Sequence, residues 1–486
     1  MEQEERNIKR NLKARHISMI AIAGCIGTGL FMTSGSGIRE AGPGGALLAY
    51  AVIGMMVYFL MTSLGEMATY LPTSGAFSTY ASRYIDPSVG FALGWNYWFN
   101  WVITVAVDVV FAAKVIYYFE PTHILPEYGW SIIFFIIIFG LNALSVRVYG
   151  ESEYWFAMLK VATVVAFLVV GVLTIVGILG GDYIGFSNFT RGDAPFLGDG
   201  LTGSFLTVLG VFLVAGFSFQ GTELIGVTAG ESENPEENIP KAVKTVFWRI
   251  LIFYILAIFV IGLLIPYDSE QLLGGDDIAT SPFTLVFEKA GLAFAASFMN
   301  AVILTSVLSA GNSGMYASTR MLYAMSKDGL AHKTFSKVNK NGVPVASLIA
   351  TAVVVVVLYV ANVTHDQTET YLFAASGLTG FIAWLGIAAS HYRFRKSYIA
   401  QGKDLNNLVY KAKWFPLGPI LAVILCILVI IGQDTQLLIE GDFDLHRLVI
   451  TYIGIPIFLV FYLYHKIKYR TKVIPLEEVD LSQDNK

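Results

Sequence analysis

The sequence predicts an all-α integral membrane protein with twelve transmembrane helices, and three observations support this class. Of the 486 residues, 55% are hydrophobic and 14% are charged, whereas a soluble domain carries about 25% charged residues. Apolar segments long enough to cross a bilayer recur along the whole chain. Two of them contain a short string that begins with Gly-Thr near the centre, Gly27-Thr28-Gly29-Leu30 and, 194 positions later, Gly221-Thr222-Glu223-Leu224.

The spans follow from the rule that about 20 apolar residues cross the hydrocarbon core. They are predicted at 17–38, 45–69, 90–118, 128–146, 153–179, 203–230, 242–266, 292–322, 345–363, 371–392, 415–433 and 447–466. The two cysteines, Cys25 and Cys426, both fall in spans and form neither a disulfide framework nor a zinc-binding pattern. Residues 469–486 are expected to form a cytoplasmic tail, and its polar part, 471–486, is expected to be disordered.

The basic residues predict the orientation of these spans. If the N-terminus is cytoplasmic, 27 of the 32 Lys and Arg residues fall in cytoplasmic segments or at the cytoplasmic ends of spans. The positive-inside rule therefore places both termini in the cytoplasm, in agreement with an even number of spans. The segment 1–16 shows no cleavable signal pattern, so the first apolar helix is expected to direct insertion.

The first span is predicted to be interrupted, because three glycines fall between Gly24 and Gly29 and glycine weakens a helix. Backbone groups freed in lipid must find partners. A new helix N-terminus after Gly27 would suit a carboxylate, and carbonyls near Ala23 and Cys25 would suit an ammonium. Close helix packing explains the glycines equally well.

The sixth span carries Glu223 at its centre, where a charge costs roughly 3 kcal/mol. Three roles fit this carboxylate: a partner for a substrate ammonium, a proton carrier, or a structural link to another span, and the first two are favoured together. Phe217 and Phe219 are expected either to shutter the site or to pack. Glu231 lies near the cytoplasmic helix end, where a solvated or ion-paired role is as reasonable as a functional one.

Other spans contain further polar residues. Two roles are open for Lys160. Its buried amine could exchange a proton and so couple proton flow to transport, or its side chain could snorkel to the cytoplasmic interface. Asp108 is a candidate for the polar lining of a site. A stripe in the eighth span either faces the cavity or forms interhelical hydrogen bonds; it comprises Ser309, Asn312, Ser313 and Ser318. Trp95, Trp98 and Trp101 are interpreted as an interfacial aromatic belt.

Several long motifs are familiar together: Ala41 to Ala46 (AGPGGA), Val57 to Glu66 (VYFLMTSLGE), Phe91 to Trp98 (FALGWNYW), Gly216 to Gly226 (GFSFQGTELIG), Ala229 to Glu233 (AGESE), Ser309 to Leu322 (SAGNSGMYASTRML) and Gly380 to Phe394 (GFIAWLGIAASHYRF). On these motifs the chain resembles the bacterial amino-acid permeases of the amino acid–polyamine–organocation superfamily. The resemblance covers nearly the whole chain.

The resemblance implies a leucine-transporter-type fold with two inverted five-helix repeats and interrupted helices 1 and 6. The corresponding segments are the cytoplasmic N-terminal segment 1–16, the first repeat 17–180, the second repeat 203–397 and two further helices in 414–468. It also implies a bacterial cytoplasmic membrane protein. Monomer and homodimer both stay open at this point.

The resemblance also implies the substrate site. Gly27, Thr28 and Gly29 would bind the amino-acid carboxylate, and Glu223 would set the preference for a cationic side chain. Carbonyls of Cys25 and of Phe217–Gln220 would bind the α-ammonium. Position 25 usually carries Ser in this motif, and the departure to Cys is expected to matter little because the backbone makes the contact. The expected substrate-binding residues are Cys25, Ile26, Gly27, Thr28, Gly29, Asp108, Phe217, Gln220, Gly221 and Glu223.

The function that follows is import of a cationic amino acid, L-lysine first, by proton symport with alternating access. Lys160, Glu231, Ser309 and Ser313 are the expected proton-coupling residues. An exchanger of the same fold, or a permease preferring arginine or histidine, is the alternative. The scattered acids do not form a catalytic cluster, and nothing predicts an ion-channel filter. We expect no metal, no cofactor other than the coupled proton and no nucleic acid; the lipid bilayer is the expected partner.

Overall fold

The computed structural model describes residues 10–24, 26–119, 124–272, 281–364, 368–434 and 444–483. Within these ranges the regular structure is helical, and one isolated β-bridge joins Leu12 to Ser232. The first helices are α1 (Ala14–Ala23), the π-helix η1 (Gly29–Thr33), α2 (Ser34–Tyr70), α3 (Ala76–Tyr84), α4 (Pro87–Ile116), α5 (Glu127–Leu144), α6 (Val146–Ile175), α7 (Gly200–Phe219), α8 (Leu224–Thr228) and the 3-10 helix η3 (Ala229–Glu231).

The second part of the chain continues in the same way. Its helices are α9 (Pro235–Arg249), the π-helix η4 (Ile250–Ile255), α10 (Leu256–Leu264), α11 (Pro282–Lys289), α12 (Ala293–Lys327), α13 (Val345–Thr364), α14 (Thr368–Ala400), α15 (Leu417–Ile431), α17 (Leu445–Thr451) and α18 (Gly454–Tyr469). Short 3-10 helices lie in connections: η2 (Ser187–Phe189), η5 (Glu270–Leu272), η6 (Lys333–Ser336), η7 (Leu405–Asn407) and η8 (Leu476–Glu478).

Among the described residues, 8 helical stretches are long and apolar enough to cross a membrane. Large apolar side chains also lie exposed along the outer faces of helices such as α13, where Val353, Val357 and Val360 are more than half exposed. Contiguous exposed apolar surface is typical of contact with lipid or a partner. The helices and this surface together are those of a multi-pass membrane protein.

The predicted spans agree with the helices to within a few residues at 90–118, 345–363 and 415–433. The break predicted between the first two spans, at 39–44, coincides with Gly42, whose φ of 76 is non-helical and separates two helical stretches that run together as α2. The carbonyl of Pro195 accepts from the amide of Gly44 at this break. One predicted span differs from the structure. The span predicted at 447–466 is divided into α17 and α18.

Both predicted helix interruptions are confirmed. The helix α1 ends at Ala23, and helical structure resumes at Thr28 and continues as a π-helix from Gly29. The helix α7 ends at Phe219, and the chain turns at 220–223 before α8 begins. Gly221 has φ 93, a left-handed conformation that favours glycine.

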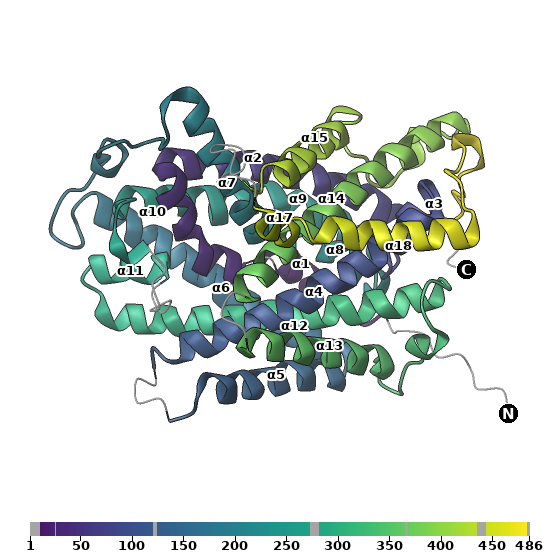
Figure 1. Ribbon diagram of the computed structural model, residues 1–486, viewed down its shortest axis with the longest axis horizontal. Helices are drawn as coiled ribbons and strands as arrows, with labels where there is room; N and C mark the ends of the chain where they lie inside the picture. The colour runs from purple at the N-terminus through teal and green to yellow at the C-terminus, as the bar shows by residue number, and fades with distance from the viewer. Residues whose placement is uncertain are drawn as a thin grey trace.

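The short helices α1 and α8, which flank the interruptions, pack against longer helices such as α6 and α12. Figure 1 shows α4, α12, α13 and α5 side by side, with α1 and α8 near the middle of the molecule. The helix α4 packs against α12 and α14, and most of its residues are buried. It is therefore a central scaffold on which the site can be built.

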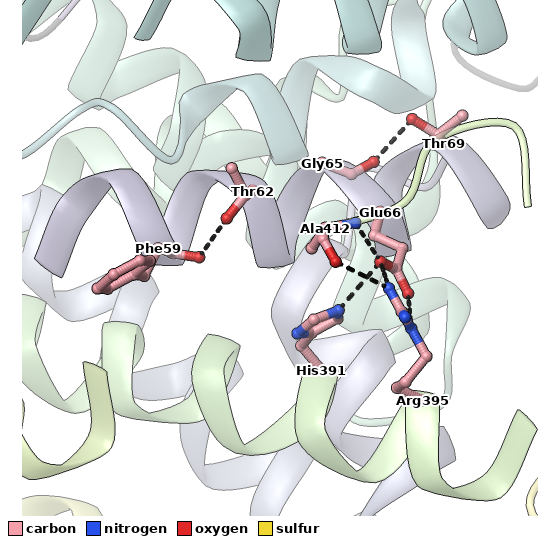
Figure 2. A network of polar contacts seen from close by, with 8 residues as sticks. All are labelled: Phe59, Thr62, Gly65, Glu66, Thr69, His391, Arg395 and Ala412. Carbon is pink, nitrogen blue, oxygen red and sulfur yellow. Dashed lines mark hydrogen bonds and ion pairs between the residues drawn. The ribbon is translucent and has the colours of Figure 1, made fainter. Parts of the chain in front are cut away.

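A buried ionic network ties the end of α2 to α14 (Figure 2). The guanidinium of Arg395 donates to both carboxylate oxygens of Glu66, with Nε 2.6 Å from Oε1. The amide of Ala412 donates to Glu66 Oε2 at 2.7 Å, and His391 Nε2 lies 3.3 Å from the same oxygen. Glu66 is 1% exposed, so its charge is balanced by these partners and not by water.

Glu66→Ala is expected to lower the free energy of unfolding by about 3–5 kcal/mol, because it leaves the buried charge of Arg395 without its partner. Thermal unfolding of the purified protein in detergent measures this loss. Glu237→Ala is the control, since that side chain is 73% exposed and its ion pair with Lys241 belongs to a class that contributes little. Equal unfolding temperatures for the two variants would contradict a stabilising role of the network.

The C-terminal tail differs from the expectation of disorder. As far as residue 483, it packs against the ends of α2, α3 and α14. Ile474 donates its amide to the carbonyl of Ile85, Arg83 pairs with Asp480 at 2.6 Å, and Leu481 is 5% exposed. Burial opposes ionisation of Asp480, but hydrogen bonds from Ser482 and Arg83 outweigh it and hold the pKa of this carboxyl below its usual value. The apolar residues among the charges explain why the tail packs.

Candidate functional site

The two helix interruptions meet. A Cβ added at Gly29 would lie 2.5 Å from Ser218 Cα and 3.0 Å from the carbonyl carbon of Phe217, so the backbones are in direct contact. A Cβ at Gly27 would lie 2.9 Å from the Ala310 Cβ of α12. The absence of a side chain is what permits these approaches. Glycine thus brings together two segments almost 200 residues apart.

A cavity opens where the interruptions meet α4 and α12. Its lining residues are Gly24, Gly27, Thr28, Gly29, Trp101, Thr104, Asp108, Phe217, Gln220 and Ala310. Six of the ten predicted substrate-binding residues are among them. Ile26 is fully buried and, like Gly221 and Glu223, lies outside this lining, while Cys25 lies outside the described residues.

Asp108 is the ionisable residue in the cavity lining. Its Oδ1 accepts from Thr28 Oγ1 at 2.5 Å, which links α4 to the first interruption. Its Oδ2 is buried and makes no hydrogen bond to the described part of the chain. A buried carboxylate oxygen without a partner is costly, so this oxygen is suited to a ligand that donates hydrogen bonds.

Trp101 corrects the interpretation of an interfacial aromatic belt. It is 3% exposed and lines the cavity, whereas Trp98 donates to Thr351 Oγ1 and Trp95 stacks on Phe461. Gly24, Thr104 and Ala310 are the other lining residues that were not among the predicted site residues. Gly24 belongs to the glycine cluster of the first interruption, and Thr104 lies three residues after Trp101, on the same helix face. Ala310 carried no signal in the sequence.

A second polar group holds the sixth-span interruption in place. Gln220 Nε2 donates to the carbonyl of Ser376 at 3.0 Å, and the same carbonyl accepts from Asn100 Nδ2 at 2.6 Å. Thr104 Oγ1 lies 2.8 Å from Ser376 Oγ. The interruption is thereby joined to α4 and α14.

Glu223 lies behind the cavity wall and is 2% exposed. Its carboxylate accepts from Tyr97 Oη at 3.2 Å, from Trp384 Nε1 at 3.1 Å and from the amide of Gly221 at 3.4 Å. These three donors are neutral, so they orient the carboxylate without cancelling its charge. Tyr97 is also in ring contact with Trp101 of the cavity wall.

Lys160 does not snorkel. It is 1% exposed and donates from Nζ to Ser309 Oγ at 2.9 Å. Ser309 in turn donates to Glu153 Oε2 at 2.7 Å, and Asn312 donates to Glu153 Oε1 at 2.7 Å. Ser309 and Asn312 of the polar stripe therefore form interhelical hydrogen bonds, whereas Ser318 donates to carbonyls of its own helix. Glu153 was not predicted, although it lies seven residues before Lys160 and hence on the same helix face.

Glu231 belongs to a separate cluster and has the ion-paired role. Its Oε1 accepts from Arg320 Nε at 2.7 Å, and both side chains are buried. The guanidinium lies over the ring of Tyr316, which stacks on Tyr149 with centroids 4.0 Å apart. Tyr149 Oη is 3.4 Å from Ser313 Oγ, so Ser313 adjoins this cluster.

Comparison with known proteins finds that this chain is similar to amino-acid permeases. Residues 16–476 match the family described as amino acid permease. The lysine-specific permease LysP of Lactococcus lactis subsp. cremoris is 57% identical over 99% of this chain and 94% of its own length. The histidine permease HisP of the same organism is 51% identical, over 99% of this chain and 100% of its own.

A solved structure agrees in fold. A mutant manganese transporter from Eremococcus coleocola superposes with a TM-score of 0.55 and covers 94% of this chain and 95% of that one. The two sequences are 14% identical, so the likeness concerns the arrangement of helices and not the site.

Proposed function

Because this chain belongs to the amino acid permease family and is a transporter rather than an enzyme, we propose that it imports L-lysine across the bacterial cytoplasmic membrane by proton symport. The named substrates of its relatives support a cationic amino acid, lysine before histidine. The observation that carries the proposal is a cavity between two helix interruptions. On its wall lies Asp108 Oδ2, which has no hydrogen-bond partner among the described residues.

The proposed architecture has twelve spans, with inverted repeats at 17–180 and 203–397 and two further helices within 414–468. Interruptions near residues 24–28 and 220–223 would then occupy corresponding places in the two repeats, as expected for a transporter of this type. The distribution of basic residues favours cytoplasmic termini, with the segment 1–16 and the tail 469–486 on the cytoplasmic side.

Lysine would bind with its backbone groups between the interruptions. The amides after Gly27 can donate to the carboxylate, and the carbonyls of the Phe217–Gln220 stretch, aided by Asp108, can accept from the α-ammonium. The side-chain ammonium would then be attracted by Glu223. Gly221 and Ile26 would support this site from behind.

Transport would follow from alternating access around this fixed site. Lysine and the proton can drive the change only through the difference in their binding free energy between the two facing states. Lys160, together with Ser309, is proposed to carry the proton. Its buried ammonium donates to Ser309 of α12, and α12 also contacts the first interruption at Gly27. Glu231 and Ser313 are proposed to assist from the adjoining cluster.

Competition of labelled lysine uptake by each of the twenty amino acids tests the substrate. We expect unlabelled lysine to compete most strongly in proteoliposomes that contain the purified protein. If histidine or arginine competes more strongly than lysine, that amino acid is the preferred substrate and the assignment of lysine is wrong. If the proteoliposomes show lysine/lysine exchange but neither a current nor a pH change on addition of lysine, the protein is an exchanger and not a proton symporter.

Lys160→Ala is expected to uncouple lysine uptake from the pH gradient, because the proposed proton carrier is removed while the cavity wall stays intact. Accumulation driven by an imposed pH gradient should fall to the level without a gradient. Lys241→Ala is the control, since that side chain is 68% exposed. Full pH-driven accumulation in Lys160→Ala would contradict the coupling role.

A further inference from the structure

A continuous hydrogen-bonded path joins an ammonium to a carboxylate inside the helix bundle. Lys160 Nζ donates to Ser309 Oγ at 2.9 Å, and Ser309 Oγ donates to Glu153 Oε2 at 2.7 Å. Lys160, Ser309 and Glu153 are each at most 2% exposed. The path needs no water, because one hydroxyl bridges the two titratable groups.

The hydroxyl of Ser309 suits proton transfer. A hydroxyl has one donor and two acceptor sites, so Ser309 can accept a proton from Lys160 while it gives its own to Glu153. Asn312 Nδ2 donates to the other carboxylate oxygen at 2.7 Å and thereby fixes the orientation of Glu153. A buried pair of separated charges is expensive, whereas a neutral amine and a neutral carboxylic acid are not, so the two protonation states of this pair can lie close in free energy.

The path also has a direction. The Cα of Glu153 lies seven residues before that of Lys160 on α6, which is about 10 Å along the helix axis. The two side chains extend toward each other and meet at Ser309 Oγ, 2.9 Å from Lys160 Nζ and 2.7 Å from Glu153 Oε2. The proposed orientation places the start of α6, at Val146, toward the cytoplasm. A proton that passes from Lys160 to Glu153 therefore moves toward the cytoplasmic side.

We propose that Glu153 is the acceptor of the coupled proton: it receives this proton from Lys160 through Ser309 and releases it to the cytoplasm. This inference rests on the proposed proton symport and adds a residue to it. In the transfer, the Nζ–H bond of Lys160 breaks as a new O–H bond forms on Ser309, and the original O–H proton of Ser309 bonds to Glu153 Oε2. The products are a neutral amine and a neutral acid. Release of the acid proton inside and protonation of the amine from outside complete one inward proton movement.

The first test compares accumulation with exchange in proteoliposomes whose membrane potential is clamped at zero. A gradient of one pH unit supports at most about tenfold lysine accumulation for one proton per lysine. We expect Glu153→Gln to reduce this ratio to about one, while lysine/lysine exchange continues within about twofold of the unaltered protein. Glu237→Gln, which changes an exposed acid in the same way, should retain the full ratio.

Full pH-driven accumulation in Glu153→Gln would overturn the inference and leave the proposed symport standing. Failure of the unaltered protein to accumulate lysine under a pH gradient would instead remove the symport itself. If Glu153→Gln also loses lysine/lysine exchange, two further variants, Glu153→Asp and Ser309→Ala, decide between a proton relay and a purely structural role of Glu153. Recovery of coupled accumulation in the aspartate variant, with Ser309→Ala slowing coupled uptake about tenfold more than exchange, supports the relay. Any other result with these two variants overturns it.

Discussion

Glu223→Gln is expected to weaken lysine binding about 100-fold. Removing one partner of a buried charge pair costs about 2–5 kcal/mol, and about 2.7 kcal/mol corresponds to this factor. The glutamine amide has nearly the shape of the carboxylate and its oxygen can still accept from Tyr97 or Trp384. The change is therefore mainly one of charge. Binding of labelled lysine to the purified protein measures it.

Norleucine distinguishes a charge partner from a structural link, because it has the lysine chain without the terminal ammonium. If Glu223 attracts that ammonium, Glu223→Gln should weaken lysine binding and leave norleucine binding nearly unchanged. Glu237→Gln, at an exposed position, should change neither. An equal loss of affinity for both ligands would show that Glu223 holds the site together and does not recognise the side chain.

The sequence predicted the helix interruptions because their signal is local. Glycine clusters and a charge at membrane depth are visible without any tertiary information, and both strings coincide with breaks in the structure. The exact shape of the break at Gly42 was harder to predict. A glycine and a proline between two apolar segments predict a break at 39–44, but its confinement to one non-helical residue depends on the Pro195 carbonyl, which lies about 150 residues further along the chain.

The cavity was predicted from the glycines and the charged residues, and the rest of its wall was not. Trp101 and Thr104 are ordinary residues for a membrane helix, so only the packing of α4 against the interruptions reveals their role. Glu153 was missed for a different reason. It lies near the predicted start of its span, where acids are usually solvated, and its burial depends on Ser309 and Asn312 of α12.

Gly29→Ala is expected to abolish lysine transport, because the added methyl group would collide with the second interruption. Its Cβ would lie 2.5 Å from Ser218 Cα and 2.8 Å from Ser218 N. Both are backbone atoms, so no side-chain rotation can relieve the contact, and the two segments that form the site must separate. We expect uptake below a tenth of that of the unaltered protein at equal amounts of folded protein in the membrane, which corresponds to at least about 1.4 kcal/mol in binding or in the transport barrier.

Gly140→Ala is the matched control for this substitution. Gly140 also lies within a membrane helix, α5, but a Cβ there would meet nothing within 4 Å. This variant should transport lysine normally, and its unfolding temperature should stay the same or rise slightly, since alanine favours helix by about 1 kcal/mol over glycine. Loss of transport in Gly29→Ala with an unchanged unfolding temperature would place the collision at the substrate site. Normal transport in Gly29→Ala would mean that the two interruptions need not touch during the cycle, and the site would then have to be assembled from α4, α12 and the second interruption alone.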